Sequence, residues 1–376
     1  MPNGGDGLFR YRRFYWCDLS LLEKRAKQIH RWSMARKRKR PALRQFFYGL
    51  RYRIGEGMLR GFVRVLPHCP AWLVLSYMRF MARVAFFFLP GYRKRMEENL
   101  VAAFGNDLST QERKALVWAA WLSFARGVLD TTQVMHYSKE RVVSTVALEG
   151  EEHIKRALEH GKGVLALSAH LGSFTMIGAR LAAAGFPFSV VVKQPADERF
   201  ARLVDGYRAQ IGIDTISAKP RREAVRGILK ALRSNHIVLV IADEFKSGDV
   251  MVDFLGLKVP APRGPATLAL RTGAITLPMF VTREPDDSLR LSVGPPIAPV
   301  ECVDLEASVV ATTALYTRHI EAAVRKSPDQ WNWLGLPRRS GEMSRAERAR
   351  QRRALRVNGG KAKIRSGQVG SGTPSS

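Results

Sequence analysis

The spacing of apolar residues changes near residue 146. From about residue 46 to that point apolar residues recur at helical intervals, and after it short apolar runs alternate with stretches of helical spacing. The runs predict strands over 164–167, 188–192, 237–241, 275–281 and 289–293, and the stretches predict helices over 172–184, 197–211, 221–233, 264–273 and 305–326. Strands and helices that alternate in this way are typical of a mainly parallel sheet with helices on both faces, which is an α/β fold.

The strongest apolar zone covers residues 58–89. Its longest uncharged run, residues 65–78, contains two prolines and is shorter than the ~20 residues that cross a bilayer. Arg79 and Arg83 then stand four residues apart, on one side of an otherwise apolar helix. The pattern favours a helix lying in a membrane interface with snorkelling arginines. A buried helical hairpin with two exposed arginines is the alternative.

A helix start is predicted at residues 107–112. Ser109 can accept a hydrogen bond from a backbone N–H of the first turn, and Glu112, three residues later, can return the contact. The helix that follows has a wide apolar face.

The net charge of +28 is concentrated at the two ends of the chain. Residues 1–60 carry 16 basic and 4 acidic side chains, and residues 338–376 carry 11 and 2, which leaves +7 for the 277 residues between them. This distribution indicates basic arms on a nearly balanced body, and such arms suit an anionic membrane or a nucleic acid equally. We expect a basic arm over 1–45, a helical membrane-interfacial region over 46–146, an α/β core over 147–337 and a basic, disordered tail over 338–376.

Cysteine and glycine patterns exclude several kinds of chemistry. Cys17, Cys69 and Cys302 are far apart, so they indicate neither a disulfide framework nor a zinc site, and a reducing cytoplasm fits them. The dinucleotide, P-loop and serine-hydrolase motifs do not occur at a strand-to-helix turn. From these two patterns we expect no metal and no cofactor.

Charged residues from Arg10 onward interrupt any signal-peptide core.

Polar residues follow three of the predicted strands. His170 comes after 164–167, Lys193 after 188–192, and Asp243 and Glu244 after 237–241. Ligands of parallel α/β sheets bind beyond the carboxyl ends of the strands, so these side chains indicate a site at one edge. His170 titrates near neutral pH and can serve there as a general base. A packed, structural histidine is the alternative.

Six short segments in order resemble the bacterial lipid A biosynthesis acyltransferases, which belong to the lysophospholipid acyltransferase superfamily. They are L-S-A-H-L-G-S at 167–173, V-K-Q-P-A-D at 192–197, I-A-D-E at 241–244, V-D-F-L-G at 252–256, R-G-P-A-T-L-A at 263–269 and D-Q-W-N-W at 329–333, with residues 93–104 as a further match upstream. The resemblance covers roughly residues 50–340 and implies a glycerolipid acyltransferase-like fold.

The family resemblance implies a catalytic pair made of a histidine, four residues and a carboxylate. His170 would remove the proton of an acceptor hydroxyl as it attacks an acyl thioester, and the carboxylate would orient the ring. Here Thr175 stands at the carboxylate position, and it brings no charge. Three outcomes are open: Asp243 or Glu244 supplies the charge, the enzyme is slow, or the site binds lipid without turnover.

The remaining site residues follow from the same resemblance. Gly172 and Ser173 would give room and donors for the thioester oxygen. Lys193, where the family usually has arginine, keeps a charge for a phosphate but loses the bidentate fork. Arg263 and Gly264, at a predicted helix start, form a second candidate anion site.

Two further sets of residues have alternative interpretations. Lys258 and Arg263 can be solvated surface charges instead of anion ligands. Trp331 and Trp333, close to Arg338 and Arg339, can form a membrane-interface rim or pack in the core.

The implied function is O-acylation of a glycolipid or lysolipid by acyl carrier protein or acyl-coenzyme A. The enzyme would be peripheral or monotopic on the cytoplasmic face of a bacterial inner membrane. Both donors are anionic and suit a basic protein. One rival is a catalytically inactive lipid-binding protein of the same fold, motivated by Thr175. Another is a nucleic-acid-binding protein, motivated by the basic run at 36–40, although anionic lipid explains basic arms beside amphipathic helices more simply.

Overall fold

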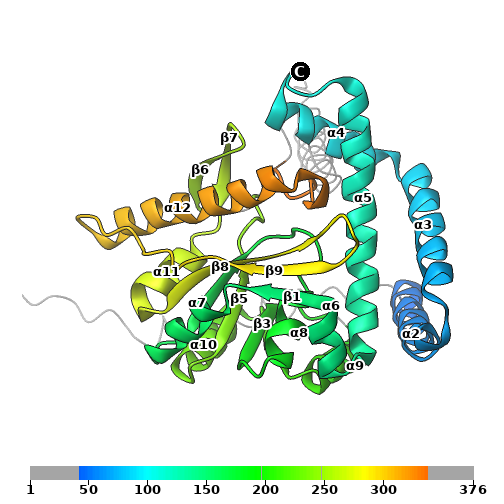
Figure 1. Cartoon of the computed structure of the whole chain (residues 1–376), viewed down its shortest axis with the longest axis horizontal. Helices are drawn as coiled ribbons and strands as arrows, with labels where there is room; N and C mark the ends of the chain where they lie inside the picture. The colour runs from blue at the N-terminus through cyan, green and yellow to red at the C-terminus, as the bar shows by residue number, and fades with distance from the viewer. Residues whose placement is uncertain (1–41, 196, 247, 338–376) are drawn as a thin grey trace, which may run out of the picture. The chain divides into compact units, whose positions relative to one another are not determined.

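The computed structural model describes residues 42–195, 197–246 and 248–337 (Figure 1). The predicted tail over 338–376 and nearly all of the predicted arm over 1–45 lie outside the described residues. The chain comprises two units, Met1–Gly55 and Glu56–Ser376. The described part of the first unit is the beginning of helix α2 (Ala42–Val65). Everything that follows concerns the second unit.

Helices make up the second unit as far as residue 145, as the periodicity predicts. They are η1 (Leu66–His68), α3 (Ala71–Phe88), α4 (Pro90–Phe104), α5 (Thr110–Gln133), η2 (Val134–His136) and α6 (Lys139–Thr145). Helix α3 buries a narrow stripe, Val74, Met78 and Ala82, and packs along α5. The indole N–H of Trp121 donates to the carbonyl of Ala82 at 3.0 Å. Phe86 near the end of α3 also packs edge to face on Trp118 and Trp121 of α5. Most of the other large apolar side chains of α3 are exposed.

The predicted helix start at Ser109 is confirmed. The Ser109 hydroxyl accepts from the Glu112 N–H at 3.2 Å, and the Glu112 carboxylate accepts from the Ser109 N–H at 2.7 Å. This reciprocal pair satisfies two backbone donors that the first turn of α5 otherwise leaves open.

The α/β prediction is also confirmed. The main sheet contains β1 (Val146–Glu149), β2 (Val164–Ser168), β3 (Phe188–Val192), β4 (Ile213–Ser217), β5 (Ile237–Ile241), β8 (Ile275–Arg283) and β9 (Leu289–Val293). Its order is β1-β9-β8-β2-β5-β3-β4, in which the five strands from β8 to β4 are parallel and β9 runs antiparallel to β8. A separate hairpin pairs β6 (Val250–Phe254) with β7 (Leu257–Ala261).

Helices cover both faces of the sheet because its central strands are apolar on both sides (Figure 1). In β2, Leu165 and Leu167 pack into one core cluster, whereas Val164 and Ala166 pack into another. The first cluster includes α10 (Arg221–Arg233), α11 (Gly264–Thr272) and α12 (Leu305–Lys326), and the second includes α6, α7 (Glu151–Glu159) and α8 (Met176–Ala183). Helix α9 (Glu198–Gln210) lies beside β4, and η3 (Pro328–Gln330) follows α12.

The structure differs from the predicted elements in two respects. Four strands were not predicted: β1, β4, β6 and β7, which are short and lie at the edges of the main sheet or in the separate hairpin. Helix α8 begins at Met176 rather than at residue 172, because residues 172–175 form a turn in which Gly172 has a φ of +53°. This turn carries part of the site described below.

Trp331 and Trp333 are core residues. Both are 0% exposed, and their rings meet edge to face with centroids 4.9 Å apart. Trp331 also contacts the ring of Phe254, and Trp333 contacts that of Phe104. Both indoles therefore pack in the interior, and the alternative of a membrane-interface rim is wrong.

Removing the Ser109 cap should destabilise the chain. We expect Ser109→Ala to lower the free energy of unfolding by about 1 kcal/mol, because the Glu112 N–H loses its acceptor. Denaturant unfolding of the full chain measures the change. Ser144→Ala is the matched control, since the Ser144 hydroxyl only contacts the carbonyl of Arg141 on the exposed side of α6. Equal losses in both variants would contradict a capping contribution.

Candidate active site

The register of two neighbouring strands brings a histidine and a carboxylate together. Ser168, the last residue of β2, pairs with Ile241, the last residue of β5. The Ala242 N–H donates to the Ser168 carbonyl at 3.0 Å and extends the ladder by one residue. His170 and Asp243 each lie two residues beyond their strand, so they meet at the carboxyl edge of the sheet.

Asp243 holds His170 through two contacts. Its Oδ1 lies 2.8 Å from His170 Nδ1, and its Oδ2 accepts from the His170 backbone N–H at 2.8 Å. Oδ2 also accepts from the indole N–H of Trp331 at 2.8 Å. The Asp243 side chain is 1% exposed and that of His170 is 38% exposed. Because a carboxylate accepts, Nδ1 carries the ring proton and Nε2 keeps the lone pair that a general base needs.

The surroundings of His170 favour its protonated form. Burial of the ring lowers the pKa of His170, but the hydrogen bond and charge of Asp243, with a smaller effect of Glu244, outweigh it and raise that pKa above its ordinary value. The imidazolium that forms when Nε2 takes a proton is therefore stabilised by the buried carboxylate.

Two cavities meet at His170. The first, called the helical pocket, has a volume of about 400 Å³ and lies between α4, α5 and the turn at 172–175. The second, called the sheet pocket, has about 600 Å³ and lies over the carboxyl ends of β3 and β5. Apolar side chains line most of both. Four residues line both pockets: Thr131, His170, Phe174 and Thr175.

The structure distinguishes among the three acidic or hydroxyl candidates for the partner of His170. Thr175 lines the pockets beside His170, but its hydroxyl lies 2.7 Å from that of Thr131 on α5, and His170 Nδ1 is bonded to Asp243 instead. Glu244 is exposed and lines the sheet pocket. Of the two carboxylates left open by the sequence, Asp243 is the one in contact with the ring.

Gly172 shapes the turn but does not offer its N–H to a ligand. That N–H donates to the carbonyl of Gln330 at 2.8 Å. A Cβ at this position would lie 2.2 Å from the carbonyl oxygen of Val281, and the φ of +53° is one that favours glycine. The expectation that Gly172 donates to a thioester oxygen is therefore wrong, because the donor is already used within the protein.

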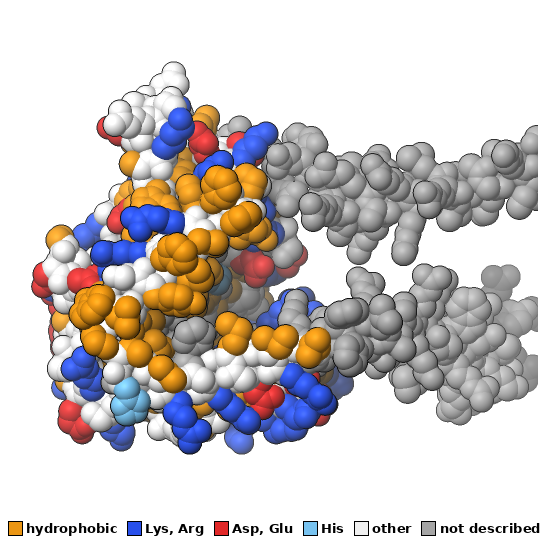
Figure 2. Space-filling view, turned by 90° about the vertical axis from the view of Figure 1, so that its right-hand side faces the viewer, with side chains coloured by type: hydrophobic (Ala, Val, Ile, Leu, Met, Phe, Trp, Pro, Cys, Tyr) orange, Lys and Arg blue, Asp and Glu red, His pale blue; other side chains and the backbone are white. Residues whose placement is uncertain are grey.

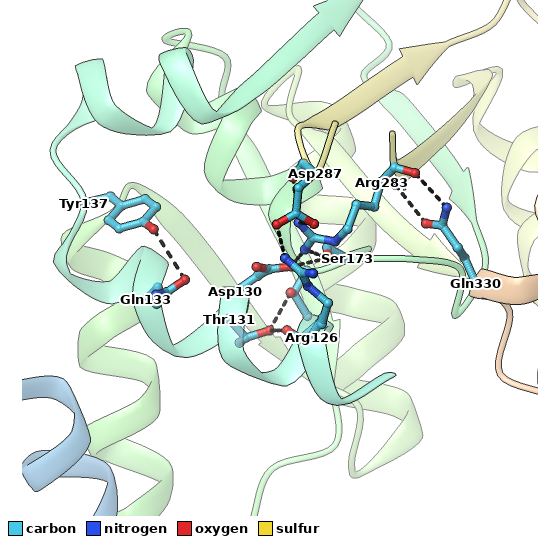
Figure 3. A network of polar contacts seen from close by, with 11 residues as sticks. Arg126, Asp130, Thr131, Gln133, Tyr137, Ser173, Arg283, Asp287 and Gln330 are labelled. Carbon is cyan, nitrogen blue, oxygen red and sulfur yellow. Dashed lines mark hydrogen bonds and ion pairs between the residues drawn. The ribbon is translucent and has the colours of Figure 1, made fainter. Parts of the chain in front are cut away.

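Ser173 is likewise committed to the protein. It is 3% exposed, and its hydroxyl donates to the carboxylate of Asp130 on α5. Asp130 also forms an ion pair with Arg283 at the end of β8 (Figure 3). The Ser173 hydroxyl is thus used within the protein, where it anchors the turn to α5.

The contacts of Ser173 belong to a wider polar network (Figure 3). Arg283 and Arg126 both contact Asp287, and the Gln330 side chain bonds the backbone N–H and carbonyl of Arg283, each at 2.8 Å. Burial raises the pKa of Asp130, although Arg283 and the Ser173 hydroxyl oppose that effect. The network joins α5, the 172–175 turn, the end of β8 and η3.

Three of the other predicted ligand residues line the sheet pocket: Lys193, Glu244 and Gly264. Lys193 forms no ion pair with any described residue, whereas Arg208, a further cation of this pocket, pairs with Asp205 at 2.9 Å. Arg263 does not line the pocket, since it pairs with Glu306 on α12. Lys258 likewise pairs with Asp253 at 2.8 Å, so both cations contact a carboxylate on the surface of the described structure.

Sequence reasoning missed Asp130, Arg283 and the hydrogen bond from Trp331. Asp130 had one signal, because it is a lone acid near the end of a helix with a wide apolar face. Trp331 had another, because a buried indole N–H needs an acceptor. Arg283 had none in the local pattern. Among the described residues, no three His, Cys, Asp or Glu side chains gather as a metal ion would require.

Comparison with known proteins decides the family. The model of the bacterial lipid A biosynthesis acyltransferases matches residues 34–338. The chain belongs to this family. It is 25% identical over 237 residues to a phosphatidylinositol mannoside acyltransferase of Mycolicibacterium smegmatis, which covers 62% of this chain and 76% of that protein. It is 24% identical over 258 residues to the lipid A biosynthesis lauroyltransferase of Escherichia coli, which covers 68% and 81%.

A third relative is the lipid A biosynthesis palmitoleoyltransferase of Escherichia coli, at 22% identity over 230 residues, 60% of this chain and 72% of that protein. All three relatives are acyltransferases by name. Family membership therefore makes acyl transfer the reaction class of this chain, a class in which a positioned histidine can serve as a general base.

Asp243→Asn should slow acyl transfer and shift its pH profile. Oδ2 of Asp243 accepts from two N–H groups, so the single oxygen of the amide turns to these donors and its NH2 faces Nδ1. The ring proton then moves to Nε2, and the amide brings no charge to stabilise the imidazolium. We therefore expect a loss of about 10³–10⁴-fold in thiol release from an acyl thioester. Activity needs neutral His170 and is lost as the pH falls through its pKa. Removing the charge lowers that pKa, so the acid limb moves to lower pH.

NMR titration of the His170 ring checks the same shift without turnover. Glu244→Gln is the control, with a smaller shift because that carboxylate is exposed and makes no contact with the ring. An unchanged pKa of His170 in Asp243→Asn would contradict the assignment.

Proposed function

We propose that the chain is a membrane-associated O-acyltransferase that moves a fatty acyl chain from a thioester to a hydroxyl of a glycolipid or lysolipid. The observation that carries the proposal is His170, bonded through Nδ1 to a buried carboxylate at the junction of two pockets. Nε2 takes the proton of the acceptor hydroxyl as its oxygen bonds to the thioester carbonyl carbon. The carbon–sulfur bond then breaks, and the thiolate leaves with the proton from His170.

The two pockets suit different parts of the substrates. The helical pocket has almost entirely apolar walls, so it suits the acyl chain. The sheet pocket carries Lys193, a cation without an ion-pair partner among the described residues, so it suits an anionic group such as a phosphate of the donor or the acceptor. This division puts the thioester carbon beside His170, where the pockets share a wall.

An exposed apolar surface supports membrane association. Figure 2 shows apolar side chains gathered on one face of the molecule, with Lys and Arg at its margin. The large exposed apolar residues of α3, α4, α5 and the junction between α3 and α4 are Trp72, Leu73, Tyr77, Phe80, Met81, Phe87, Phe88, Leu89, Tyr92, Val101, Phe124 and Val128. This set, called the apolar surface, is larger than scattered surface residues explain.

The apolar surface is continuous with the helical pocket. Leu89, Tyr92, Phe124 and Val128 are exposed and also line that pocket, so an acyl chain can pass from a lipid phase to His170. Helix α3 is long and apolar enough to cross a membrane. Because one side of α3 packs on α5, we place it in the interface, on the cytoplasmic face of a bacterial inner membrane. Residues 46–146 are then the membrane-interfacial region and residues 147–337 the catalytic core.

Helix α10 favours acyl carrier protein over coenzyme A as the donor. Arg222, Arg226, Lys230 and Arg233 are exposed at intervals that place them on one side of this helix, and none forms an ion pair with a described residue. On its inner side, Ile228 lines the sheet pocket. The α10 stripe, as we call these four residues, suits a strongly acidic protein that must reach this pocket with its thioester.

The lipid-binding alternative predicts the same fold and pockets without turnover. The contact between Asp243 and His170 favours catalysis, because it brings the charge that Thr175 does not. The nucleic-acid alternative depends on the run at 36–40, which lies outside the described residues.

Lipid mass spectrometry of the native host tests the function. We expect deletion of the gene to remove a lipid species that wild type restores and His170→Ala does not, because the variant has no base. His153→Ala is the matched control, since His153 lies on α7 and lines neither pocket. Restoration by His170→Ala would reject the catalytic mechanism in favour of lipid binding.

Charge reversal tests the α10 stripe. We expect Arg222→Glu with Arg226→Glu to raise KM for an acyl carrier protein donor by about tenfold or more, with kcat and the KM for acyl-coenzyme A unchanged, because electrostatic steering acts on association. Arg318→Glu with Lys326→Glu makes the same charge change on α12, where both side chains are exposed. A carrier-protein KM that is equally high in both pairs, or unchanged in both, would contradict specific docking.

A further inference from the structure

Two threonine hydroxyls form a pair at the wall that the pockets share. Thr131 comes from the last turns of α5, and Thr175 precedes α8. Their Oγ1 atoms are 2.7 Å apart, and both residues line both pockets with His170. Thr175 occupies the position where the family pattern has a carboxylate, so its chemistry is particular to this chain.

The protons of the pair can be assigned by counting donors. Each hydroxyl has one proton. Thr131 Oγ1 lies 2.6 Å from the carbonyl oxygen of Gly127, which can only accept, so the Thr131 proton is used there. Thr175 must then donate to Thr131. No described residue donates to Thr175 Oγ1, whose free lone pairs are left as a hydrogen-bond acceptor beside His170.

We propose that Thr175 is a specificity residue that accepts a hydrogen bond from a second hydroxyl of the acceptor lipid. This inference rests on the proposed function. The hydroxyl to be acylated donates to His170 Nε2, and another hydroxyl of the same molecule donates to Thr175 Oγ1. The site therefore selects acceptors with at least two hydroxyls near the reacting end, such as sugars and glycerol head groups, over lipids with one.

The neutral acceptor also excludes an anion from this place. Phosphate oxygens accept hydrogen bonds, so they gain nothing from an oxygen whose proton is already used. A phosphate of the substrate is better placed at Lys193, across the sheet pocket. A carboxylate at position 175 would accept a hydroxyl as well, but it would add a second negative charge near the one that Asp243 already brings to His170.

A pair of synthetic lipids isolates the second hydroxyl. Hexadecyl 2,3-dihydroxypropyl phosphate and hexadecyl 2-hydroxyethyl phosphate share the chain and the phosphate charge, and the first has one more hydroxyl-bearing carbon. We measure their Kd in micelles without donor and their kcat/KM with donor. We expect wild type to bind the diol more tightly than the mono-alcohol. Thr175→Val should raise the Kd of the diol by about 3–10-fold, as expected for the loss of one neutral hydrogen bond, and leave the Kd of the mono-alcohol unchanged.

Three further variants separate the acceptor from simple packing. Thr175→Ser keeps the hydroxyl and should keep the preference, and Thr131→Val removes the acceptor of the Thr175 proton and should weaken it. Thr132→Val is the matched control, since its hydroxyl bonds the carbonyl of Val128 at 3.0 Å and lines neither pocket. A diol preference that survives Thr175→Val overturns the inference.

The binding measurement separates this inference from the proposed function. Equal binding of the two lipids by wild type, or binding of neither, overturns the inference whatever the turnover. A diol preference in Kd that Thr175→Val removes, together with no acylation of either lipid, supports the inference and counts against acyl transfer.

Discussion

The candidate active site depends on one buried carboxylate. Asp243 accepts three hydrogen bonds, from the ring and the backbone of His170 and from the indole of Trp331. A buried carboxylate without such donors would be costly, so burial and the three contacts require one another. The same contacts hold His170 at the carboxyl edge of β2 and tie the segment after η3 to β5. The Asn332 N–H, which donates to the His170 carbonyl at 3.1 Å, closes the arrangement from the other side.

The polar network at Ser173 holds the far end of the same loop. Asp130 and Arg283 are largely buried, and the cost of removing two charges from water offsets much of their attraction. Such a pair contributes more to position than to stability. Here it links the turn at 172–175 to α5, the helix that forms a wall of the helical pocket. The loop is thus held to the sheet by Asp243 and to the helical region by Asp130.

The strands that the sequence predicts are those that the local spacing of apolar residues determines. Strands β2, β3 and β5 are almost entirely apolar because helices cover both faces, and that signal is visible in the sequence. β6 was missed although it alternates buried and exposed residues, because five alternating positions are a weak signal. β1 and β4 lie at the edges of the sheet, where fewer positions must be apolar.

The site was predictable as far as strand topology determines it. Parallel strands end at one edge, so His170 and Asp243 were expected to be near each other, and the register at Ser168 makes that neighbourhood a contact. The choice between Asp243 and Glu244 depends on which side chain turns inward after the strand. The roles of Gly172 and Ser173 depend on Gln330 and Asp130, which are more than 40 residues away in sequence. Local pattern contains no information on such partners.

The position of the charge explains how a threonine can stand at residue 175. The imidazolium that forms when Nε2 takes a proton needs one negatively charged partner. Asp243 supplies that charge, and its side chain is 1% exposed. The Asp243 carboxylate already contacts Nδ1 and orients the ring, so a carboxylate at residue 175 is not needed for that purpose. It would also repel the buried charge of Asp243. A hydroxyl whose proton is bound to Thr131 keeps the hydrogen-bond acceptor and omits the charge. In the mechanism that we propose, the acid of the pair is therefore Asp243, just beyond the neighbouring strand, and residue 175 is left for the acceptor.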